Sequence, residues 1–289
     1  MSFASGTKES NIVGKPNQDR CVCESPMRCS KSWHLFFVAD GHGTDGHVVS
    51  QFVAETLPQC MQRLHSQRKL PAVSSRSKSS WLKAYVQFIR DAIVDTNERL
   101  ARSSSAGGVS EESGCTLCGM WVVHGVGIVF NVGDSRAVYV LGEGGPSVQI
   151  TRDHKPDDDR EMKRIKKHGG HVARLSHDSP ARLWHSKAMM APGLALSRAL
   201  GDFGAVPCGL THLPAVSTTT FAGGFIVIAS DGLWDYLTNE QVAALSAKKR
   251  SAKSYCSAIM QAALKASEGG YRDDCTAVVV AASAFATEG

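Results

Sequence analysis

Four apolar stretches of the sequence each meet an aspartate with a glycine or a second acid beside it, where a strand would end. They are VADGHG with Asp40, NVGDSRA with Asp134, VIASDGLWD with Asp231, and RDDCTAVVV with Asp273 and Asp274. A fifth acid, Asp19 in KPNQDR, precedes the first of them. A single Asp-Gly pair is ordinary turn chemistry. Several carboxylates gathered at one edge of a core would repel and lose hydration, so this fold needs a cation at that edge.

The composition of the acid set indicates a hard divalent cation. Carboxylate oxygens without cysteine or histidine partners favour magnesium or manganese over zinc. The nine cysteines are scattered, and the CxxC pair Cys115 and Cys118 has no second pair at zinc-like spacing. We therefore interpret them as buried strand thiols. Free thiols, and an N-terminus without a secretory signal, favour a reducing compartment, so we expect the cytoplasm or the nucleus.

Short β-branched runs bounded by Gly, Asp or Pro predict strands, and apolar residues at helical spacing predict helices. The expected strands are HLFFVAD, CTLCGMWVV, GVGIVFNVG, RAVYVLG, SVQIT, GFIVIAS and CTAVVVAA. The expected helices cover residues 46–65, 81–100, 157–167 and 254–266. Pro58 predicts a bend or a break in the first helix. Ser-rich stretches at 67–80 and 103–113 are expected to be polar loops.

The order of these elements predicts an antiparallel α+β layered domain rather than a parallel βαβ array. No linker divides the chain, so residues 1–289 are expected to form a single domain. The net charge of +5, from 32 basic and 27 acidic residues, is too balanced to indicate nucleic-acid binding. The stretch CTLCGMWVVHGVGIVF is interrupted at His124 and falls short of the ~20 residues of a membrane helix. We expect no membrane span, and a monomer.

Eight motifs in a fixed order carry a family resemblance. They are PNQDR, FFVADGHG, SGCT, NVGDSRA, TRDHKP, GLALSRALGD, IVIASDGLWDYL and RDDCTAVVV. The chain resembles a type 2C protein phosphatase of the metal-dependent (PPM) family almost from end to end. The resemblance implies a four-layer α-β-β-α sandwich with a central antiparallel β-sandwich and a dinuclear metal centre at one end. It also implies hydrolysis of phosphoserine and phosphothreonine in protein substrates, with at least two Mg²⁺ or Mn²⁺ ions.

The same resemblance implies the metal ligands. Asp40 would bridge the two ions, and the backbone carbonyl of Gly41 would bind one of them, because only a bare backbone lets a carbonyl come this close. Asp231 and Asp273 would complete the protein ligands of the other ion. Asp134 matches the position linked to a third, weaker metal in some family members.

Two further residues would serve the chemistry. Asp19 follows the usual acidic ligand position and is expected to orient water at the metals. His42 would be the general acid that protonates the leaving serine or threonine oxygen, a step that contributes about 10²–10⁴-fold to such reactions. One strand would thus deliver both catalytic residues, the bridging carboxylate of Asp40 and the imidazole of His42.

The chain departs from the family pattern at the second metal and at the phosphate. Gln18 stands where the family often has a glutamate that holds the second metal, and its amide oxygen could still bind the ion without charge. Gly14 stands where the family often has a phosphate-binding arginine, so that arginine is absent from this chain. Lys15 is expected to replace it as a point charge without bidentate geometry. Asp274 replaces the usual asparagine, and the sequence offers no reason for that choice.

The segment 176–193 falls where the family carries a flap beside the active site. Arg182, Trp184, His185 and the pair Met189–Met190 either read the substrate or form a structural lid, and the structural lid is the preferred interpretation. His154 and His171 are expected to be structural. Ser197 and Arg198 are expected to pack a loop, with Arg198 anchoring an acid inside the domain.

Two other functions compete with an active protein phosphatase. A pseudophosphatase would keep the fold as a binding module and lose catalysis through Gln18 and the missing arginine, but Asp40, Asp231 and Asp273 are all intact. A hydrolase of nucleotides or small phosphoesters would favour a phosphate-binding glycine loop, and the sequence contains no GxxxxGK[ST] motif. The active phosphatase is therefore preferred.

Overall fold

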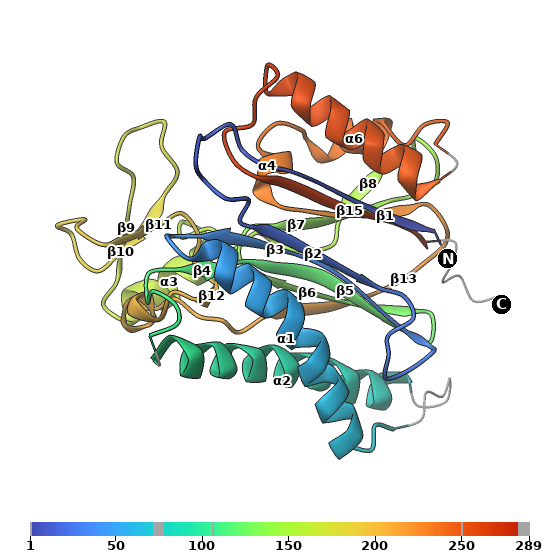
Figure 1. The fold of residues 1–289 in the computed structure, drawn as a ribbon, viewed down its shortest axis with the longest axis horizontal. Coiled ribbons are helices and arrows are strands. Elements are labelled where there is room, and N and C mark those ends of the chain that lie inside the picture. The colour runs from blue at the N-terminus through green and yellow to red at the C-terminus, as the bar shows by residue number, and fades with distance from the viewer. Residues whose placement is uncertain (1, 72–77, 106, 250, 283–289) are drawn as a thin grey trace.

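Two antiparallel β-sheets face each other at the centre of the molecule, and helices cover the outer side of each (Figure 1). This computed structural model describes the whole chain except residues 1, 72–77, 106, 250 and 283–289. The predicted four-layer α-β-β-α sandwich is confirmed. Sequential strands pair through short turns, as in β5 (Leu117–Val123) with β6 (Val126–Val132), which is why the sheets are antiparallel.

The first sheet has five strands in the order β1-β15-β14-β7-β8. Their bounds are β1 (Phe3–Lys8), β15 (Cys275–Ala281), β14 (Phe225–Ala229), β7 (Arg136–Val140) and β8 (Ser147–Gln149). The second sheet has the order β12-β4-β3-β5-β6-β13, and β2 also pairs with β3. Its remaining strands are β2 (Asp19–Glu24), β3 (Trp33–His42), β4 (Gly114–Cys115), β12 (Leu200–Gly201) and β13 (Ala215–Thr220).

Strand β3 is apolar without interruption because both of its faces are buried. Phe36 and Val38 lie in the core between the two sheets. Leu35, Phe37 and Ala39 alternate with them and lie in the core between the second sheet and its helices. A strand in this position reads as a continuous hydrophobic run rather than as an alternating one. The run leads straight to the acid at its end.

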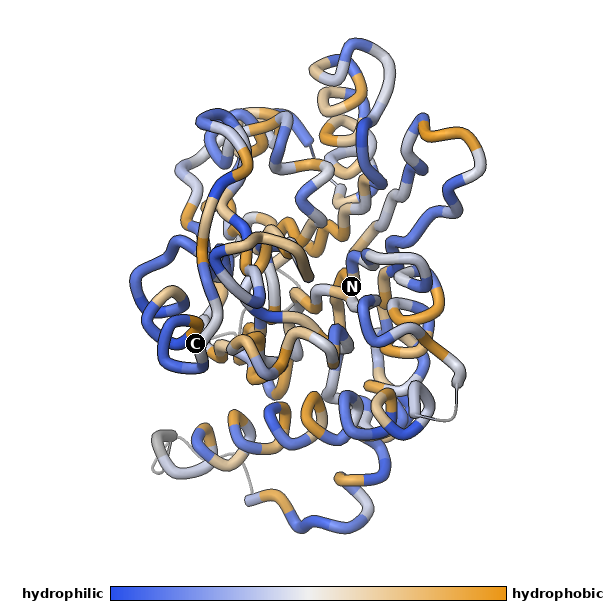
Figure 2. The backbone as a smooth tube through the Cα atoms, turned by 90° about the vertical axis from the view of Figure 1, so that its left-hand side faces the viewer, coloured by the Kyte–Doolittle hydropathy of each residue, from blue (hydrophilic) through white to orange (hydrophobic). Residues whose placement is uncertain are grey.

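Helices α1 (Gly46–Gln67) and α2 (Lys78–Ser105) cover the second sheet, and α6 (Ala252–Ala266) covers the first (Figure 1). Hydrophobic and hydrophilic residues alternate along α2, the helix at the bottom of Figure 2, as expected when one face of a helix packs on a sheet. The shorter helices are α3 (Asp159–Lys167), α4 (Asp231–Trp234), α5 (Asn239–Ala244) and the 3-10 helix η2 (Phe203–Cys208). No described helix has both the length and the hydrophobicity of a membrane span.

Several predicted boundaries differ from the structure. Helix α1 continues through Pro58, so of the predicted bend or break the break is absent. Helix α2 begins at Lys78 and ends at Ser105, so both expected Ser-rich loops are shorter than predicted, and residues 72–77 of the first lie outside the described residues. Strands β1, β2 and β13 were not predicted, because they are half-exposed and carry few apolar residues. All nine cysteines lie among the described residues and are free thiols.

The flap segment forms a small sheet of its own at one end of the sandwich, on the left of Figure 1. Its strands are β9 (His171–Ala173), β10 (Arg182–Trp184) and β11 (Pro192–Leu194). A separate apolar cluster joins it to α3 and η2 through Ile165, Leu183, Leu196 and Cys208. The flap is therefore anchored at its base, whereas its tip is exposed, with the Met190 side chain 87% accessible.

Candidate metal centre and active site

The residues proposed from the sequence surround one cavity of ≈ 420 Å³ at the flap end of the sandwich. The cavity is lined by Lys15, Gln18, Asp40, Gly41, His42, Gly43, Glu112, Thr116, Asp134, Arg182, Pro192, Gly193, Leu194, Ala195, Leu196, Asp231 and Asp273. Asp19 and Asp274 do not line it. The acids come together because β3 ends here, α4 starts here after β14, and β15 begins here. Strands separated by most of the chain therefore deliver their carboxylates to one place.

Strand pairing places Asp40 directly opposite Asp19 of β2. The next residue, Gly41, has its own steric reason to be glycine. A Cβ at this position would lie 2.3 Å from the carbonyl oxygen of Gly46 and 2.7 Å from that of Gln18. The start of α1 can therefore pack against the end of β3 only over a bare backbone. Close backbone packing is thus one reason for a glycine at this position. Access of a cation to the Gly41 carbonyl, which the sequence suggested, is the other.

Asp19 lies behind the cavity rather than in its wall. Its side chain is buried, and its Oδ2 accepts a hydrogen bond from the Ser230 hydroxyl at 2.7 Å. Its Oδ1 is buried without a partner among the described residues. Burial raises the pKa of Asp19 to about 6, and the hydroxyl of Ser230 partly opposes that rise. A buried carboxylate oxygen without a partner is suited to hold a water molecule or to face a cation.

The acids in the cavity wall are electrostatically unfavourable in the absence of a cation. Burial raises the pKa of Asp40 well above its usual range, and the charges of Asp19 and Asp231 raise it further. Burial, followed by the charge of Asp134, raises the pKa of Asp231 to about 8. Like charges and desolvation both oppose ionisation. A divalent cation would remove both penalties.

Two lysines partly neutralise the rim of the cavity. The Nζ of Lys15 lies 2.7 Å from Asp273 Oδ1 and 3.5 Å from Asp274 Oδ2. The Nζ of Lys155 lies 2.5 Å from Asp134 Oδ2. Lys15 lines the cavity as the sequence suggested, but its ammonium contacts an acid of the candidate metal site. Lys155, which the sequence reasoning did not single out, could have been found in the DHKP run that follows Asp134.

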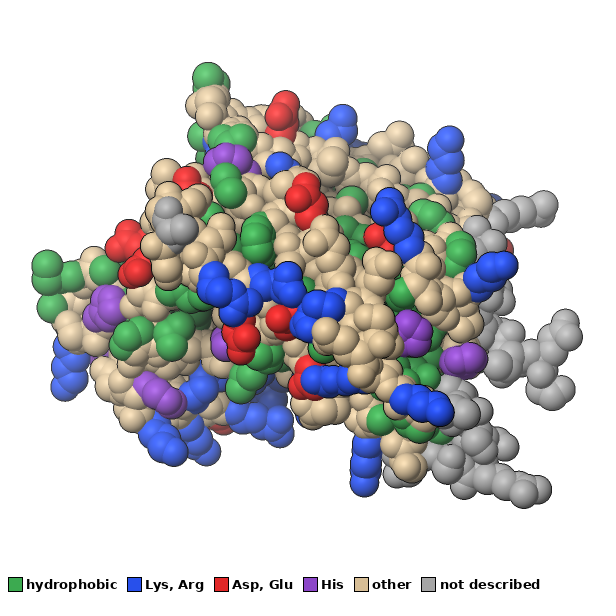
Figure 3. Space-filling model, turned by 60° about the horizontal axis from the view of Figure 1, so that its bottom comes forward, with side chains coloured by type: hydrophobic (Ala, Val, Ile, Leu, Met, Phe, Trp, Pro, Cys, Tyr) green, Lys and Arg blue, Asp and Glu red, His purple; other side chains and the backbone are tan. Residues whose placement is uncertain are grey.

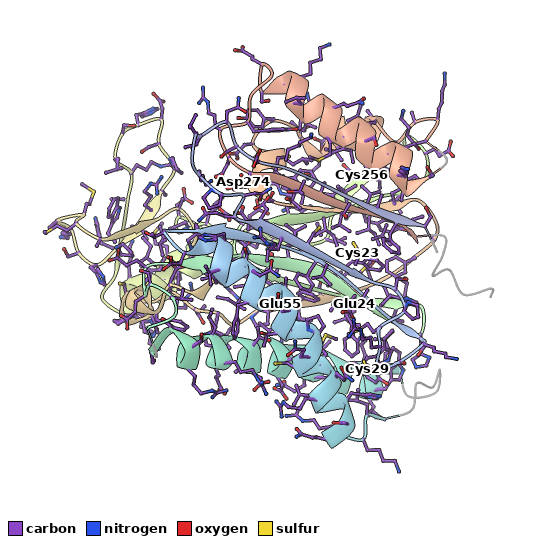
Figure 4. All side chains as sticks on the ribbon, in the orientation of Figure 1. Cys23, Glu24, Cys29, Glu55, Cys256 and Asp274 are labelled. Carbon is purple, nitrogen blue, oxygen red and sulfur yellow. The ribbon has the colours of Figure 1, made fainter. Side chains whose placement is uncertain are left out.

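The structure supplies a role for Asp274. Its side chain is 2% exposed, and its two oxygens accept hydrogen bonds from the backbone N–H groups of Ser10 and Gln18, each at 2.8 Å. Asp274 therefore fixes the segment before β2 against the start of β15, at the flap end of the sandwich (Figure 4). That contact sets the position of Gln18.

The side chain of Gln18 is oriented by its own amide. Its Nε2 donates a hydrogen bond to the carbonyl oxygen of Gly43 at 2.8 Å. The side chain is buried and lines the cavity. Because the amide nitrogen is engaged, Oε1 is the atom left for a cation or a water molecule. The uncharged oxygen predicted at this position is therefore held beside Asp40 and Gly41.

His42 forms an ion pair with an acid that the sequence reasoning did not assign. Its Nε2 lies 2.6 Å from Oδ2 of Asp202, which is 2% exposed. Burial lowers the pKa of His42, but the charge and hydrogen bond of Asp202 outweigh it, so the pKa is raised. A Cβ at Gly114 would lie 2.1 Å from Asp202 Oδ2, which explains the glycine of the SGCT motif. The His42 imidazole is thus held in place by a carboxylate that favours its protonated form.

Of the flap side chains singled out in the sequence, Arg182 lines the cavity. Its Nη1 donates to the Gly193 carbonyl at 2.6 Å, and its Nε is buried without a partner among the described residues. Trp184 is buried and packs over Gly193, and the His185 Nδ1 lies 2.9 Å from Cys208 Sγ. Trp184 and His185 therefore hold the flap together, as the structural interpretation predicts, whereas Arg182 can contact a substrate.

Arg198, Ser197 and Arg164 form a hydrogen-bonded network around the Glu161 carboxylate of α3. Arg198 makes a bidentate contact with Glu161, at 2.6 Å from Nη2 to Oε1 and 3.0 Å from Nε to Oε2. Arg164 and Ser197 also donate to Glu161. Burial raises the pKa of Glu161, but the hydrogen bonds from Arg198 and the other donors lower it to about 2. The acid expected to be anchored by Arg198 is therefore Glu161. His154 accepts the Gly133 N–H at 3.1 Å in a buried, structural setting.

The donor set fits divalent cations of the magnesium type, since it consists of buried carboxylate, amide and carbonyl oxygens. Within the described ranges, however, no three His, Cys, Asp or Glu side chains are already arranged around a common point at metal-binding spacing. Two of the acids, Asp134 and Asp273, instead contact lysines. Binding would therefore need the Gly41 carbonyl, Gln18 or water as additional ligands.

Comparison with known proteins places these observations in a family. Residues 4–276 match the sequence model described as Protein phosphatase 2C. "Probable protein phosphatase 2C 48" of Oryza sativa subsp. japonica is 33% identical over 91% of this chain and 79% of the rice protein. "Probable protein phosphatase 2C 72" of Arabidopsis thaliana is 34% identical over 81% of this chain and 71% of its own length.

Solved structures show the same fold. The serine-threonine phosphatase 2C from Toxoplasma gondii superposes with a TM-score of 0.81 at 22% identity, covering 96% of this chain and 94% of that one. A C. elegans sex determining protein superposes with a TM-score of 0.77 at 21% identity, covering 97% of this chain and 64% of that one. At these identities the structural comparison establishes the shared fold.

Proposed function

The chain belongs to the protein phosphatase 2C family and is a protein serine/threonine phosphatase, and we propose that it acts through two Mg²⁺ or Mn²⁺ ions held in the acid-lined cavity. The family resemblance seen in the sequence is thereby confirmed, and with it a metal-dependent reaction. The observation that supports a dinuclear centre is the convergence of Asp40, Asp231 and Asp273 with the Gly41 carbonyl on one cavity.

The ligands divide between the two ions according to their positions. Asp40 lies near the end of β3, opposite Asp19 of β2, and lines the same cavity as Asp231 and Asp273. It would bridge both ions. Asp231 and Asp273 would hold one ion. The Gly41 carbonyl and Gln18 Oε1 would hold the other with less charge. Asp134, next to Lys155, would serve a third and weaker ion.

His42, held by Asp202, would protonate the leaving group of the reaction. Two divalent cations bound here would activate a water nucleophile and neutralise the phosphoryl oxygens. His42 carries the proton that the departing serine or threonine oxygen needs, because the Asp202 carboxylate raises its pKa. Asp202 also fixes the ring through Nε2, which leaves Nδ1 without a partner among the described residues and free to donate. Asp19, behind the wall, would orient water.

The phosphate would be bound by cations of the protein at the cavity wall. Arg182 reaches the cavity from the flap, and its guanidinium can contact phosphate oxygens. Lys15 can do so only by leaving Asp273, which a metal ion at Asp273 would favour. Arg182 therefore replaces Lys15 as the stronger candidate for the phosphate contact in the absence of the family's usual arginine.

The direct test is phosphate release from a phosphothreonine peptide with Mn²⁺, with Mg²⁺, and after EDTA treatment. Turnover with either metal, and none after EDTA, is expected. The Asp40→Ala variant serves as the matched negative control. A folded wild-type protein that binds Mn²⁺ without turnover would indicate a pseudophosphatase. Full activity in EDTA would exclude a dissociable metal centre.

A further inference from the structure

A second surface hollow lies between α2 and β13, and none of its residues line the active-site cavity. Its volume is ≈ 780 Å³. Helix α2 contributes Leu82, Lys83, Val86 and Arg90, and β13 contributes Val216 and Thr218. We call this hollow the α2–β13 groove. Nothing in the proposed reaction uses it.

One side of the groove is a free strand edge. Among the described residues, strand β13 stands at the end of its sheet and pairs with β6 alone. No other backbone hydrogen bond joins residues 215–220 to the described part of the chain. Alternate peptide groups of β13 therefore face outward without a backbone partner in the described part of the chain. Such an edge can accept a further strand from another polypeptide, with main-chain hydrogen bonds supplying affinity.

The other side of the groove is apolar. Leu82 and Val86 are one helical turn apart on α2, and both are only partly buried where they pack against the core. Val216 of β13 packs against the same core. These three side chains form a wall beside the strand edge. A strand added to β13 would place every second side chain against that wall.

The rim of the groove carries two cations without partners. Lys83 and Arg90 are exposed, and neither makes a hydrogen bond or ion pair with any described residue. By contrast, Arg63 on α1 and Arg68, which directly follows α1, each contact an aspartate of α2. Figure 3 shows this face of the molecule, where basic side chains stand beside hydrophobic ones. Two unpaired cations separated by seven residues lie on the same side of a helix and favour an acidic ligand.

From these features we infer that the α2–β13 groove binds an extended segment of a partner protein, added as a strand to β13, whose α2-facing positions carry both apolar and acidic residues. Its apolar side chains would contact Leu82, Val86 and Val216. Its carboxylates would contact Lys83 and Arg90. A second copy of this chain fits less well, because pairing two β13 edges would bring the two cation pairs close to each other.

The test uses a fluorescein-labelled peptide of about ten residues, the length of a strand, in which valine and glutamate alternate along one face and threonine fills the other. Fluorescence polarisation should show saturable binding to the whole protein. The double variant Lys83→Glu with Arg90→Glu should weaken binding about tenfold or more, since both rim charges are reversed. Arg102→Glu, which changes an exposed cation of α2 outside the groove, should change it less than about twofold. Hydrolysis of p-nitrophenyl phosphate should be unaffected in all variants.

Amide hydrogen exchange tests whether the peptide binds as an added strand. Amide hydrogen exchange in residues 215–220 should slow when the peptide is bound, and a proline-containing version of the peptide should not bind, since proline cannot donate to a strand ladder. The inference is overturned if the glutamate peptide shows no binding, if a lysine-for-glutamate peptide binds as tightly, or if binding leaves exchange in β13 unchanged. Concentration-dependent dimers that are lost in a Val86→Asp variant would assign the groove to a second copy instead.

Discussion

Asp202 is the residue on which the proposed role of His42 depends. It holds the ring at 2.6 Å and supplies the charge that raises the histidine pKa. We predict that Asp202→Asn lowers kcat on a phosphothreonine peptide by about 10–100-fold, because the general acid is both less well oriented and less protonated. The loss on p-nitrophenyl phosphate should be much smaller, since that leaving group needs little protonation. Equal losses on the two substrates would contradict this role.

Gln18 is proposed to set how tightly one of the two metal ions is bound. Its amide oxygen carries no net charge, and an added charge at about 4 Å is worth up to ~4 kcal/mol at an effective dielectric constant of 20. Gln18→Glu is therefore predicted to shift half-saturation to lower Mn²⁺ concentration, with kcat changed less. Calorimetric titration of both proteins measures this, with Gln51→Glu on the exposed side of α1 as the control. Unchanged affinity would mean that position 18 does not contribute a ligand.

Some residue roles could be predicted from the sequence, and others could not. The acids and His42 stand in motifs whose local pattern already indicates chemistry. The contacts of His42 with Asp202 and of Arg198 with Glu161 join residues 160 and 37 positions apart, so no local pattern specifies them. Asp274 likewise acts through two distant backbone N–H groups. These contacts depend on strand order, which the sequence does not display.

At the scale of elements, burial decided which strands could be predicted. Strand β3 was predicted because both of its faces are buried and its run is continuously apolar. Strands β1 and β13 were not predicted from the sequence because each is an edge strand with exposed, small or polar side chains. Helix α1 continues past Pro58 because packing of its buried face on the sheet outweighs a local preference.

The connection between α3 and the segment before β12 rests on Glu161. Its buried carboxylate accepts hydrogen bonds from Arg164, Arg198 and Ser197. We predict that Glu161→Gln lowers the free energy of unfolding by about 2–3 kcal/mol, because it leaves partly buried guanidinium groups without their counter-charge. Urea unfolding measures this. The control Asp159→Asn, exposed in the first turn of the same helix, should cost less than about 1 kcal/mol. A loss no larger than that of the control would contradict the role given to Glu161.

At the scale of the whole molecule, we expect the acid cluster to make the stability of the fold depend on bound metal. Asp231, with a pKa of about 8, binds more protons in the folded state than in the unfolded state, where its pKa is 3.8. The stability that it contributes is therefore fully present below about pH 4 and is lost progressively as pH rises to about 8. We predict that Tm of the metal-free protein falls between about pH 5 and about pH 8, and that Mn²⁺ raises Tm most at the upper end.

Differential scanning calorimetry with EDTA or Mn²⁺ measures this dependence. The Asp231→Asn variant should flatten the pH profile of the metal-free protein, because the titrating group is gone. A metal-free Tm that rises across this range would contradict the assignment of Asp231 to a repulsive, cation-requiring cluster.

Asp40 is proposed to bridge two divalent cations that both take part in turnover. The most direct test of this proposal counts the Mn²⁺ ions bound per chain by calorimetry while phosphopeptide hydrolysis is followed in the same samples. Activity is predicted to appear as a second ion binds, and Asp40→Asn is predicted to lose high-affinity binding and turnover together while remaining folded. Full activity with a single ion bound, or an Asp40→Asn variant that keeps both ions and normal turnover, would contradict the account.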